Sequence, residues 1–480
     1  RQIVHDQQER MVYYEDAVFD VMGVPVAYLP FFSHPDPTVE RKSGFLAPTF
    51  SRASTYGLAV RIPYFIALDQ SRDVTLTAFP TTKDGPIAIG EYRQAFDNGL
   101  LRLEGSFGVL DTATDGGTES RGHLFGEGRF SVGDLGIGPA AEAGLELALT
   151  SDDAYLARYG FSDQDRLESV AYLQNYGENG FYRLRGTGFE SLRDNEPDGD
   201  RLFALPEFEA RTSLPLNGSL GLNGWGDADL GRIGLGAGGV VLSRPDGRDV
   251  GRISLSGDWE ATRITDIGFT LRGFAEARLD SYTVHDDDRF GDGAAVRFYP
   301  QAGVEARYPL VGTLGNSMHL IEPGAMLVLA PDEIDAGDIP NEDSQTVEFD
   351  EANIFSTNRF PGYDRVETGT RLNLGVRYTR LGGDPFRLDG SLGRVLRVSE
   401  DGAFTEGSGL APQQSDWVAS LGFGYAPWLD VTNRFRVDDE FKVNRAEIEG
   451  SLTFARGSLS ASYVFLGADV QANAPEDRAE

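Results

Sequence analysis

Apolar and polar residues alternate along most of the chain from residue 44 onward. The alternation is clearest in residues 100–110, 269–280, 371–379 and 445–454. In the first of these segments, one face carries Leu101, Leu103, Phe107 and Val109. Because successive side chains of a β-strand point to opposite faces, a period of two predicts strands with one apolar and one polar face. Phe274 is an exception, since it falls on the polar face of its segment.

The alternating segments are long and numerous. They run for about 9–13 residues, against about 5–6 in typical soluble strands, and about twenty of them follow residue 44. Tight connectors such as 83–86 alternate with long acidic ones such as 284–293. Strands of this length cross a bilayer when tilted, and short turns at one end with long loops at the other are typical of membrane barrels. The pattern predicts an all-β chain built as a large antiparallel transmembrane β-barrel.

Residues 1–42 differ from the rest of the chain. They contain strand-like segments that we expect to be shorter than membrane length, followed by a proline-containing linker at 33–42. We place a domain boundary near Lys42, which divides the chain into residues 1–42 and 43–480. Because the chain starts at an arginine and ends in a polar tail at Glu480, we interpret it as a fragment of a longer protein.

Composition and charge narrow the class of protein. The formal net charge is −32 and the pI is about 4.5, which disfavours a nucleic-acid partner because phosphate binding needs a basic surface. The chain has no cysteine, and therefore neither a disulfide nor a thiolate metal site. No uncharged apolar run reaches the roughly 18 residues of a transmembrane helix, so membrane insertion would require a closed barrel.

No catalytic or metal-binding motif stands out, and we expect neither enzymatic activity nor a cofactor or metal. The histidines fall in loops or at strand ends, outside any nucleophile or metal motif: His5, His34, His123, His285 and His319. The acidic stretches 286–288 and 341–344 are interpreted as solvated loops rather than Ca²⁺ sites, and the EF-hand-like stretch 111–116 has Ala113 where an oxygen ligand belongs. Loose bridging of divalent ions to lipid phosphates stays open.

Arginines on the polar faces have two interpretations. They could form a path for an anionic substrate, or they could pair with neighbouring glutamates inside the barrel. The arginines concerned are Arg61, Arg102, Arg272, Arg371 and Arg377. We favour ion pairing, and the substrate path stays open.

Two prolines interrupt neighbouring strands at their centres. Pro48 lies in SGFLAPTF (43–50), and Pro63 lies in VRIPYFIAL (60–68). Proline has no backbone N–H and cannot donate to a sheet ladder. Since proline also occurs at strand ends and edges, the pattern alone leaves a structural and a functional interpretation open.

Two stretches resemble the lipopolysaccharide-assembly protein LptD family. GVPVAYLPFFSHPDPTVERKSGFLAPTFSRASTYGLAVRIPYFIAL (23–68) resembles the family's junction between a periplasmic β-jellyroll and the first barrel strands. NEDSQTVEFDEANIFSTNRFPGYDRVETGTRLNLGVRYT (341–379) resembles a second signature, Asn-Arg-Phe-x-Gly-Tyr-Asp-Arg-x-Glu followed by a strand. The resemblance implies that an outer-membrane barrel at 43–480 is preceded by the C-terminal end of a periplasmic β-jellyroll.

The resemblance also implies a function and partners. In the family, lipopolysaccharide arrives from a periplasmic bridge of related Lpt jellyroll proteins, passes through the jellyroll and leaves sideways into the outer leaflet of the outer membrane. An LptE-type lipoprotein plugs the barrel. Prolines in the first two barrel strands loosen the seam with the last strand, and Pro48 and Pro63 match these positions. They would then form a lateral gate.

This sequence departs from better-known members of the family in two ways. It lacks the cysteines whose disulfides join jellyroll and barrel, and it ends before the expected closing strands. Two alternatives stay open. One is a porin or receptor-type barrel that passes small solutes, and the other is a soluble secreted β-protein.

The alternation also predicts the register of the first hairpin. A turn centred on Thr55 pairs Phe50 with Val60, and it brings both prolines to adjacent rungs, with Pro48 opposite Ile62 and Ala47 opposite Pro63. The more apolar face of the first strand would contact lipid through Leu46, Pro48 and Phe50.

The longest predicted loop, 332–366, carries most of the second signature. Its aromatic, basic and acidic residues suggest an ordered segment. We expect a hydrogen-bonded cluster to hold this loop against the barrel or its plug, formed by Asn358, Arg359, Tyr363, Asp364 and Arg365.

Overall fold

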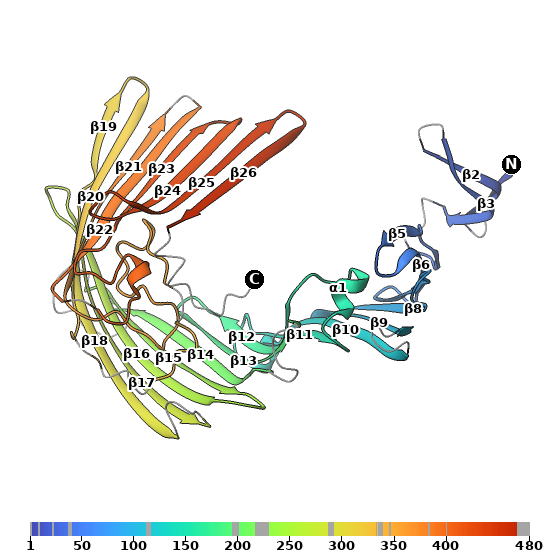
Figure 1. Cartoon of the computed structure of the whole chain (residues 1–480), viewed down its shortest axis with the longest axis horizontal. Helices are drawn as coiled ribbons and strands as arrows, with labels where there is room; N and C mark the ends of the chain where they lie inside the picture. The colour runs from blue at the N-terminus through green and yellow to red at the C-terminus, as the bar shows by residue number, and fades with distance from the viewer. Residues whose placement is uncertain are drawn as a thin grey trace. The chain divides into compact units, whose positions relative to one another are not determined.

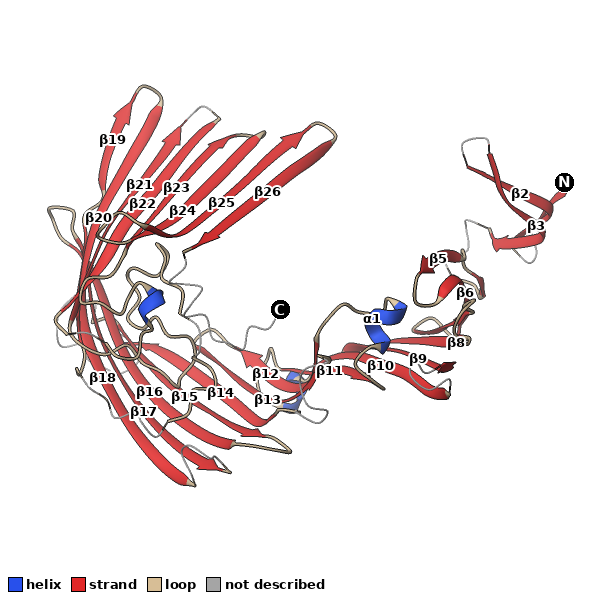
Figure 2. Ribbon diagram, viewed as in Figure 1, coloured by secondary structure: helices blue, strands red, loops and turns tan. Residues whose placement is uncertain are grey.

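Strands dominate the computed structural model of the protein, as Figures 1 and 2 show. Within the described residues, no helix is long and apolar enough to cross a membrane. The structure describes residues 2–7, 10–21, 24–36, 41–111, 117–193, 201–216, 230–286, 292–332, 334, 339–344, 347–382, 385–399 and 401–467.

The chain forms two compact units. Unit 1 comprises Arg1–Ala210 and Gly239–Val250, and unit 2 comprises Arg211–Gly238 and Gly251–Glu480. The first three strands make a small antiparallel sheet of their own, formed by β1 (Gln2–Asp6), β2 (Met11–Val21) and β3 (Val24–Pro35). The expectation of short strands is wrong for β2 and β3, which have 11 and 12 residues. The domain boundary near Lys42 stays a prediction.

Within the described residues, all later strands belong to a large antiparallel sheet of 23 strands. This sheet confirms the predicted fold class. The strands that lie in unit 1 are β4 (Gly44–Phe45), β5 (Thr49–Ala53), β6 (Gly57–Ala67), β7 (Arg72–Phe79), β8 (Ile87–Phe96), β9 (Gly99–Asp111), β10 (Thr118–Ser131), β11 (Glu142–Thr150), β12 (Arg166–Tyr176) and β13 (Gly180–Ser191).

Strands β14 (Phe203–Pro215), β15 (Arg232–Ser243) and β16 (Asp249–Ile264) have residues in both units. The strands wholly in unit 2 are β17 (Thr270–His285), β18 (Gly293–Arg307), β19 (Leu310–Leu314), β20 (Ser317–Leu329), β21 (Arg371–Gly382), β22 (Phe386–Arg397), β23 (Trp417–Tyr425), β24 (Leu429–Val437), β25 (Val443–Phe454) and β26 (Gly457–Leu466). The described helices are η1 (Gly133–Leu135), α1 (Tyr155–Tyr159) and η2 (Glu406–Ser408).

The apolar face of the strands is the exposed one. In β9, Phe107 and Val109 are 59% and 54% exposed, whereas Ser106 and Leu110 on the opposite face are buried. A soluble β-sandwich does the reverse and buries its apolar face. The alternation read from the sequence therefore places apolar side chains on the outer face of the sheet.

In unit 1 the other face is covered by the connection between β11 and β12. This segment contains α1, whose residues Tyr155, Leu156 and Tyr159 have no exposed surface. They pack in one core with residues of β6 to β10 and β12, including Phe79 and Leu110. The helix ends at Gly160, whose φ of 67° favours glycine.

In unit 2 the same face is covered by the long segment between β20 and β21. Its residues Phe349, Ile354 and Phe360 form a buried core with Val395 of β22. Phe355 packs on a second cluster formed by Phe274, Met326 and Val328. Phe274, the exception to the alternation, is thus an apolar residue on the inner face that the folded loop covers.

The exposed apolar face generates a prediction about the medium. We expect the full-length protein to require detergent for extraction, because water solvates these side chains poorly. On a gel in dodecyl sulfate, the unboiled protein should migrate faster than the boiled protein. A monomer that stays in solution without detergent would contradict the membrane interpretation.

Candidate functional site

The first two strand segments, β4 and β5, both pair with β6, but in different registers. Phe50 lies opposite Val60 and Ala53 opposite Gly57, so the predicted turn centred on Thr55 is confirmed. In β4, however, Phe45 lies opposite Tyr64, a shift of one residue. The predicted pairing of Ala47 with Pro63 is therefore wrong.

A bulge at residues 46–48 explains the shift. Three residues, 46 to 48, lie opposite only two, Ile62 and Pro63, and they have no strand assignment. Leu46 donates its N–H to the carbonyl of Pro63 across 2.9 Å. Pro48, at the end of the bulge, thus lies outside the ladder instead of opposite Ile62.

The backbone of Pro63 faces β4 rather than β7. Its carbonyl accepts from Leu46, whereas Leu58 and Val60 bond to Thr82 and Pro80 on the other side. In an antiparallel strand, the N–H and C=O of one residue point to the same neighbour. The N–H that Pro63 lacks would therefore have donated to Leu46, and the pair keeps one of its two bonds.

Proline inside a strand is not enough to break the ladder. Pro300 pairs with Ala277 in the middle of β18 without interruption. Pro323 of β20 likewise pairs with Val376 of β21, although the ladder on its other edge is interrupted between β18 and β19. The ladder between β6 and β7 also continues through Pro63, which lies opposite Thr77. The break at Pro48 is thus a local property of the first strand.

The outer face of this hairpin is apolar, as predicted for Phe50, Leu58 and Tyr64. The prediction that Leu46 lies on this face is wrong, because Leu46 pairs with Pro63 on the opposite face. Phe50 is 80% exposed, and Leu58 and Tyr64 are also exposed. Because of the bulge, Phe45 joins this face, and its ring contacts Tyr64 edge-on at a centroid distance of 4.9 Å.

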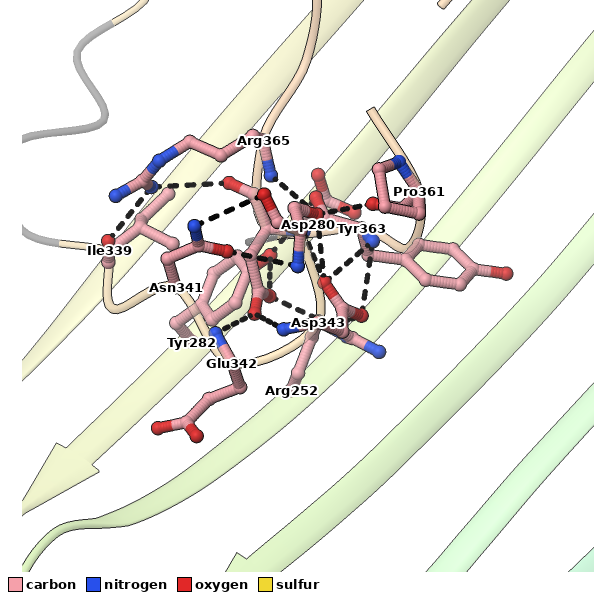
Figure 3. A network of polar contacts seen from close by, with 12 residues as sticks. Arg252, Asp280, Tyr282, Ile339, Asn341, Glu342, Asp343, Pro361, Tyr363 and Arg365 are labelled. Carbon is pink, nitrogen blue, oxygen red and sulfur yellow. Dashed lines mark hydrogen bonds and ion pairs between the residues drawn. The ribbon is translucent and has the colours of Figure 1, made fainter. Parts of the chain in front are cut away.

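A second candidate region is the loop between β20 and β21, which binds the inner face of β16 to β18 (Figure 3). Arg252 of β16 donates to Asp343 at 2.6 Å and to Asp364 at 2.8 Å. The hydroxyl of Tyr282, in β17, donates to Asp364 at 3.0 Å. The two loop carboxylates therefore connect the loop to two neighbouring strands.

The loop is also held through its main chain. Arg297 of β18 donates to the carbonyl of Asp364 at 2.7 Å, and its guanidinium is fixed by Asp280. Arg278 donates to the carbonyl of Tyr363 at 2.8 Å. The side chains of Arg297 and Asp280 have no exposed surface, so this ion pair is fully removed from solvent.

Within the loop, the two carboxylates accept main-chain N–H groups. Asp364 accepts from Glu342 and Asp343, and Asp343 accepts from Tyr363 and Asp364. Figure 3 shows these contacts joining the two halves of the loop, 341–344 and 361–365. Among the described residues, no cluster of His, Asp and Glu suits a metal ion.

A third network surrounds one buried carboxylate. Glu367 is contacted by Arg359 at 2.6 Å, by Arg371 at 3.2 Å and by Arg397. The side chains of all four residues are 0–1% exposed. Arg359 also donates to the carbonyl of Ile354 at 2.6 Å. Glu367 therefore joins the loop to the first residue of β21 and the last of β22.

These contacts shift the pKa values of the loop carboxyls in different directions. Burial disfavours the charge of Glu367, but the three guanidiniums outweigh it and lower its pKa to about 2. Burial and the neighbouring charge of Asp343 raise the pKa of Asp364. Burial also opposes ionisation of Asp343, yet Arg252 and main-chain N–H groups lower its pKa.

The structure divides the predicted loop cluster between two networks. Tyr363 and Asp364 belong to the Arg252 network, where Arg365 donates to the carbonyl of Ile339 at 3.0 Å. Asn358 and Arg359 belong to the Glu367 network, because Asn358 accepts the N–H of Glu367 at 3.0 Å. Contact of the loop with a plug protein stays a prediction.

Sequence reasoning missed the strand partners of the loop. Arg252 and Arg297 are polar-face arginines near the start of β16 and β18, and Arg278 lies in the middle of β17, which was the available signal. Their partners lie 66 to 112 positions away along the chain, so no local pattern connects them. Glu367 was missed as well, although it is the last residue of the quoted signature.

Ion pairing accounts for three of the five polar-face arginines singled out in the sequence. Arg102 pairs with Glu91 and Glu104, Arg272 with Glu305, and Arg371 with Glu367. Arg61 instead donates to the carbonyl of Tyr159 at 3.0 Å.

Arg377 and His123 differ from what the sequence predicts. Arg377 is exposed, and no ion pair is recorded for it in the described part of the chain. His123 lies inside β10 instead of at a strand end, which corrects the sequence interpretation, and it contacts Ser106 at 2.6 Å. The EF-hand-like residues 112–116 and Asp287–Asp288 lie outside the described residues.

Comparison with known proteins identifies the family. The family described as "LptD: LPS transport system D" matches residues 119–479, three quarters of the chain. The chain belongs to this family. The match includes the loop between β20 and β21 and both of its networks.

Curated relatives cover the first strands as well. LPS-assembly protein LptD of Methylococcus capsulatus is 25% identical over 468 residues, covering 93% of this chain and 44% of the relative. The LptD protein of Psychrobacter cryohalolentis is 26% identical over 81% of this chain and 40% of its own length. That of Polaromonas sp. is 28% identical over 78% and 46%. The chain spans about half the length of the curated relatives it matches.

One solved structure is also similar, the Pseudomonas aeruginosa OccK2 (OpdF) crystal structure. It is 13% identical, covering 88% of this chain and 96% of that chain, with a TM-score of 0.24.

The Glu367 network generates a mutational prediction. Glu367→Gln leaves three buried guanidiniums without their carboxylate, and breaking a buried ion pair costs about 3–5 kcal/mol. We expect the loop to detach from β21 and β22, so that a protease cleaves within 358–367 at least tenfold faster than in the wild type. Glu178→Gln, in the exposed turn between β12 and β13, is the control and should leave the cleavage rate unchanged. Equal rates for both variants would contradict the anchoring role.

The pKa values generate a prediction for the pH dependence. The pKa of Glu367 is lowered in the folded protein, so its stabilising effect is complete above its ordinary pKa of about 4.3 and is lost as pH falls toward 2. Asp364 has the opposite sign, because its raised pKa favours the protonated form in the folded loop. We expect hydrogen exchange in 351–367 to accelerate between pH 4 and 2, after correction for the intrinsic rate. The acceleration should be smaller in Glu367→Gln, and an identical profile in that variant would refute the assignment.

Proposed function

We propose that this chain is the barrel part of an outer-membrane translocon that inserts lipopolysaccharide into the outer leaflet. Family membership supports the assignment, because the curated relatives are named LPS-assembly proteins. The lipid would leave through a lateral gate at the first strand, between β4–β5 and the last strand of the complete barrel. The barrel would lie in the outer membrane, with residues 1–42 in the periplasm.

The observation that carries the gate is the break in the first strand. The ladder to β6 stops at residues 46–48, where Pro48 lies in the bulge and Pro63 lacks the N–H that Leu46 would accept. A ladder bond is worth about 0.5–1.5 kcal/mol net in water, and an unpaired acceptor in lipid costs several kcal/mol. A strand weakened by this amount still assembles, but it deforms more easily than its neighbours.

Pro48 and Pro63 affect different parts of the first hairpin. Thr49 lies opposite Arg61, whose backbone faces β5, so Thr49 faces β6. Pro48 would remove a donor from the bulge that directly precedes Thr49, whereas Pro63 weakens the hold of β6 on the first strand.

The proposal includes partners. Lipopolysaccharide would reach the barrel from periplasmic jellyroll proteins of the Lpt bridge, and an LptE-type lipoprotein would occupy the barrel. The loop between β20 and β21 supports an interior contact surface, because its networks hold it on the inner face of β16 to β18. The alternative of a porin or receptor-type barrel has no specific observation in its favour.

Replacing both prolines tests the gate. Pro63→Ala supplies the N–H that completes the pair with Leu46, and Pro48→Ala supplies a donor within the bulge. We expect the double variant to deliver several-fold less lipopolysaccharide to the cell surface, while folded barrel accumulates normally. Surface lipopolysaccharide is measured in cells that carry only the variant.

Pro300→Ala is the matched control, since Pro300 also lies within a strand but the ladder continues through it. It should leave delivery unchanged. Wild-type delivery and a normal outer-membrane barrier in the Pro48→Ala, Pro63→Ala double variant would refute the gate.

A further inference from the structure

The residues just before β4 are fastened to the turn between β6 and β7. Arg41 donates to the carbonyl of Gln70 at 2.7 Å and forms an ion pair with Asp73. Arg93 of β8 donates to the other oxygen of Asp73 at 2.8 Å. Asp73 therefore joins two arginines from different parts of the chain, and it is only 8% exposed.

A hydrogen bond between uncharged groups also holds the residues that precede β4 against β6. The hydroxyl of Ser43 accepts the N–H of Ala67, the last residue of β6, at 2.9 Å. The guanidinium of Arg41 also lies 5.9 Å from the ring centre of Phe65. Hydrogen bonds to charged groups contribute more than neutral ones, especially where water is largely excluded. The start of the first strand is thus held by contacts that do not depend on the β-ladder.

The other end of the hairpin is fastened as well. Tyr56, in the turn between β5 and β6, is buried and stacks on Tyr159 of α1 with ring centres 6.0 Å apart. Tyr159 and Arg158 both donate to Asp84, at 2.7 and 3.0 Å. Lys83 donates to the carbonyl of Ser54 at 2.7 Å. Both ends of the first hairpin are therefore fixed, and the bulge lies between them.

We propose that Asp73 is a positioning residue for the gate: through Arg41 and Arg93 it keeps β4 paired with β6 while the seam opens on the other edge. This inference rests on the gate proposed above, and it states that β4 stays paired with β6 when the gate opens. Residues 46–48 would flex between two fixed ends. The strand edge offered to the lipid would then be the outer edge of β4 and β5, not a gap between β5 and β6.

A reversible lock between β4 and β6 tests which pairing opens. Phe45 and Tyr64 lie directly opposite each other. The neighbouring pair of Leu46 and Pro63 carries the hydrogen bond. Phe45 and Tyr64 are thus a non-hydrogen-bonded pair, with the closer Cα spacing of about 4.5 Å, which a disulfide can bridge. This chain has no cysteine of its own to compete. The variant to test is Phe45→Cys with Tyr64→Cys.

We expect this disulfide to form readily and to leave lipopolysaccharide delivery unchanged when oxidised. Loss of delivery on oxidation with recovery on reduction would overturn the inference, because it would show that β4 must leave β6. Failure of the disulfide to form in folded barrel would also count against it. The Pro48→Ala, Pro63→Ala double variant tests the gate separately. If the gate proposal itself is wrong, that variant delivers lipopolysaccharide normally, whatever the effect of the disulfide between positions 45 and 64.

Removal of Arg41 tests the fastening directly, with a readout independent of transport. In Arg41→Ala we expect amide hydrogen exchange in 44–46 of the purified full-length protein to rise about tenfold, while exchange in β8 and β9 stays the same. Arg41→Lys keeps the charge beside Asp73 and should recover part of the protection. Arg193→Ala breaks a more exposed pair with Asp165 and is the control. Unchanged exchange in Arg41→Ala would refute the role of Asp73.

Discussion

The structure depends on the need of every backbone N–H and C=O to find a partner where water is absent. In an antiparallel sheet that exposes its apolar face, the ladder supplies these partners. In the first strand the ladder to β6 is incomplete: Pro63 cannot donate to Leu46, and the bulge takes Pro48 out of register. In the proposed gate, this incomplete ladder would let the first strand deform more easily than its neighbours.

On the polar face of the sheet, charged side chains are buried and must be compensated by partners. Glu367 is surrounded by three guanidiniums, and the carboxylates of Asp343 and Asp364 accept main-chain N–H groups as well as Arg252. A buried charge is tolerated only when it is paired and its remaining hydrogen-bonding groups are used. The loop between β20 and β21 pairs its buried carboxylates by folding onto strand arginines, which makes its position on the inner face of unit 2 specific. Within the described part of the chain, the Nε atoms of Arg359 and Arg397 nevertheless have no hydrogen-bond partner.

Much of this arrangement could be predicted from the sequence, because the alternation reports directly on the two faces of each strand. The pairing of Phe50 with Val60 followed from it and is observed. The bulge did not follow, since Phe45 and Leu46 are both apolar and either could occupy the outer face. For the loop, the signature pointed to Asn358, Arg359, Tyr363, Asp364 and Arg365. Their partners on β16 to β18 could not be found, because long-range ion pairs leave no periodic trace.

Two exceptions to the regular strand pattern, the bulge at Pro48 and the apolar residue Phe274 on the polar face, have opposite consequences. The bulge that ends at Pro48 interrupts the ladder of a strand whose ends are fixed, by Arg41 and Asp73 at one end and by Tyr56 and Tyr159 at the other. Phe274, an apolar residue on the polar face, is covered by Phe355, which adds packing to a loop already held by ion pairs. In the proposed gate, the fixed ends would confine movement to residues 46–48, whereas the covered exception at Phe274 would oppose movement of the loop.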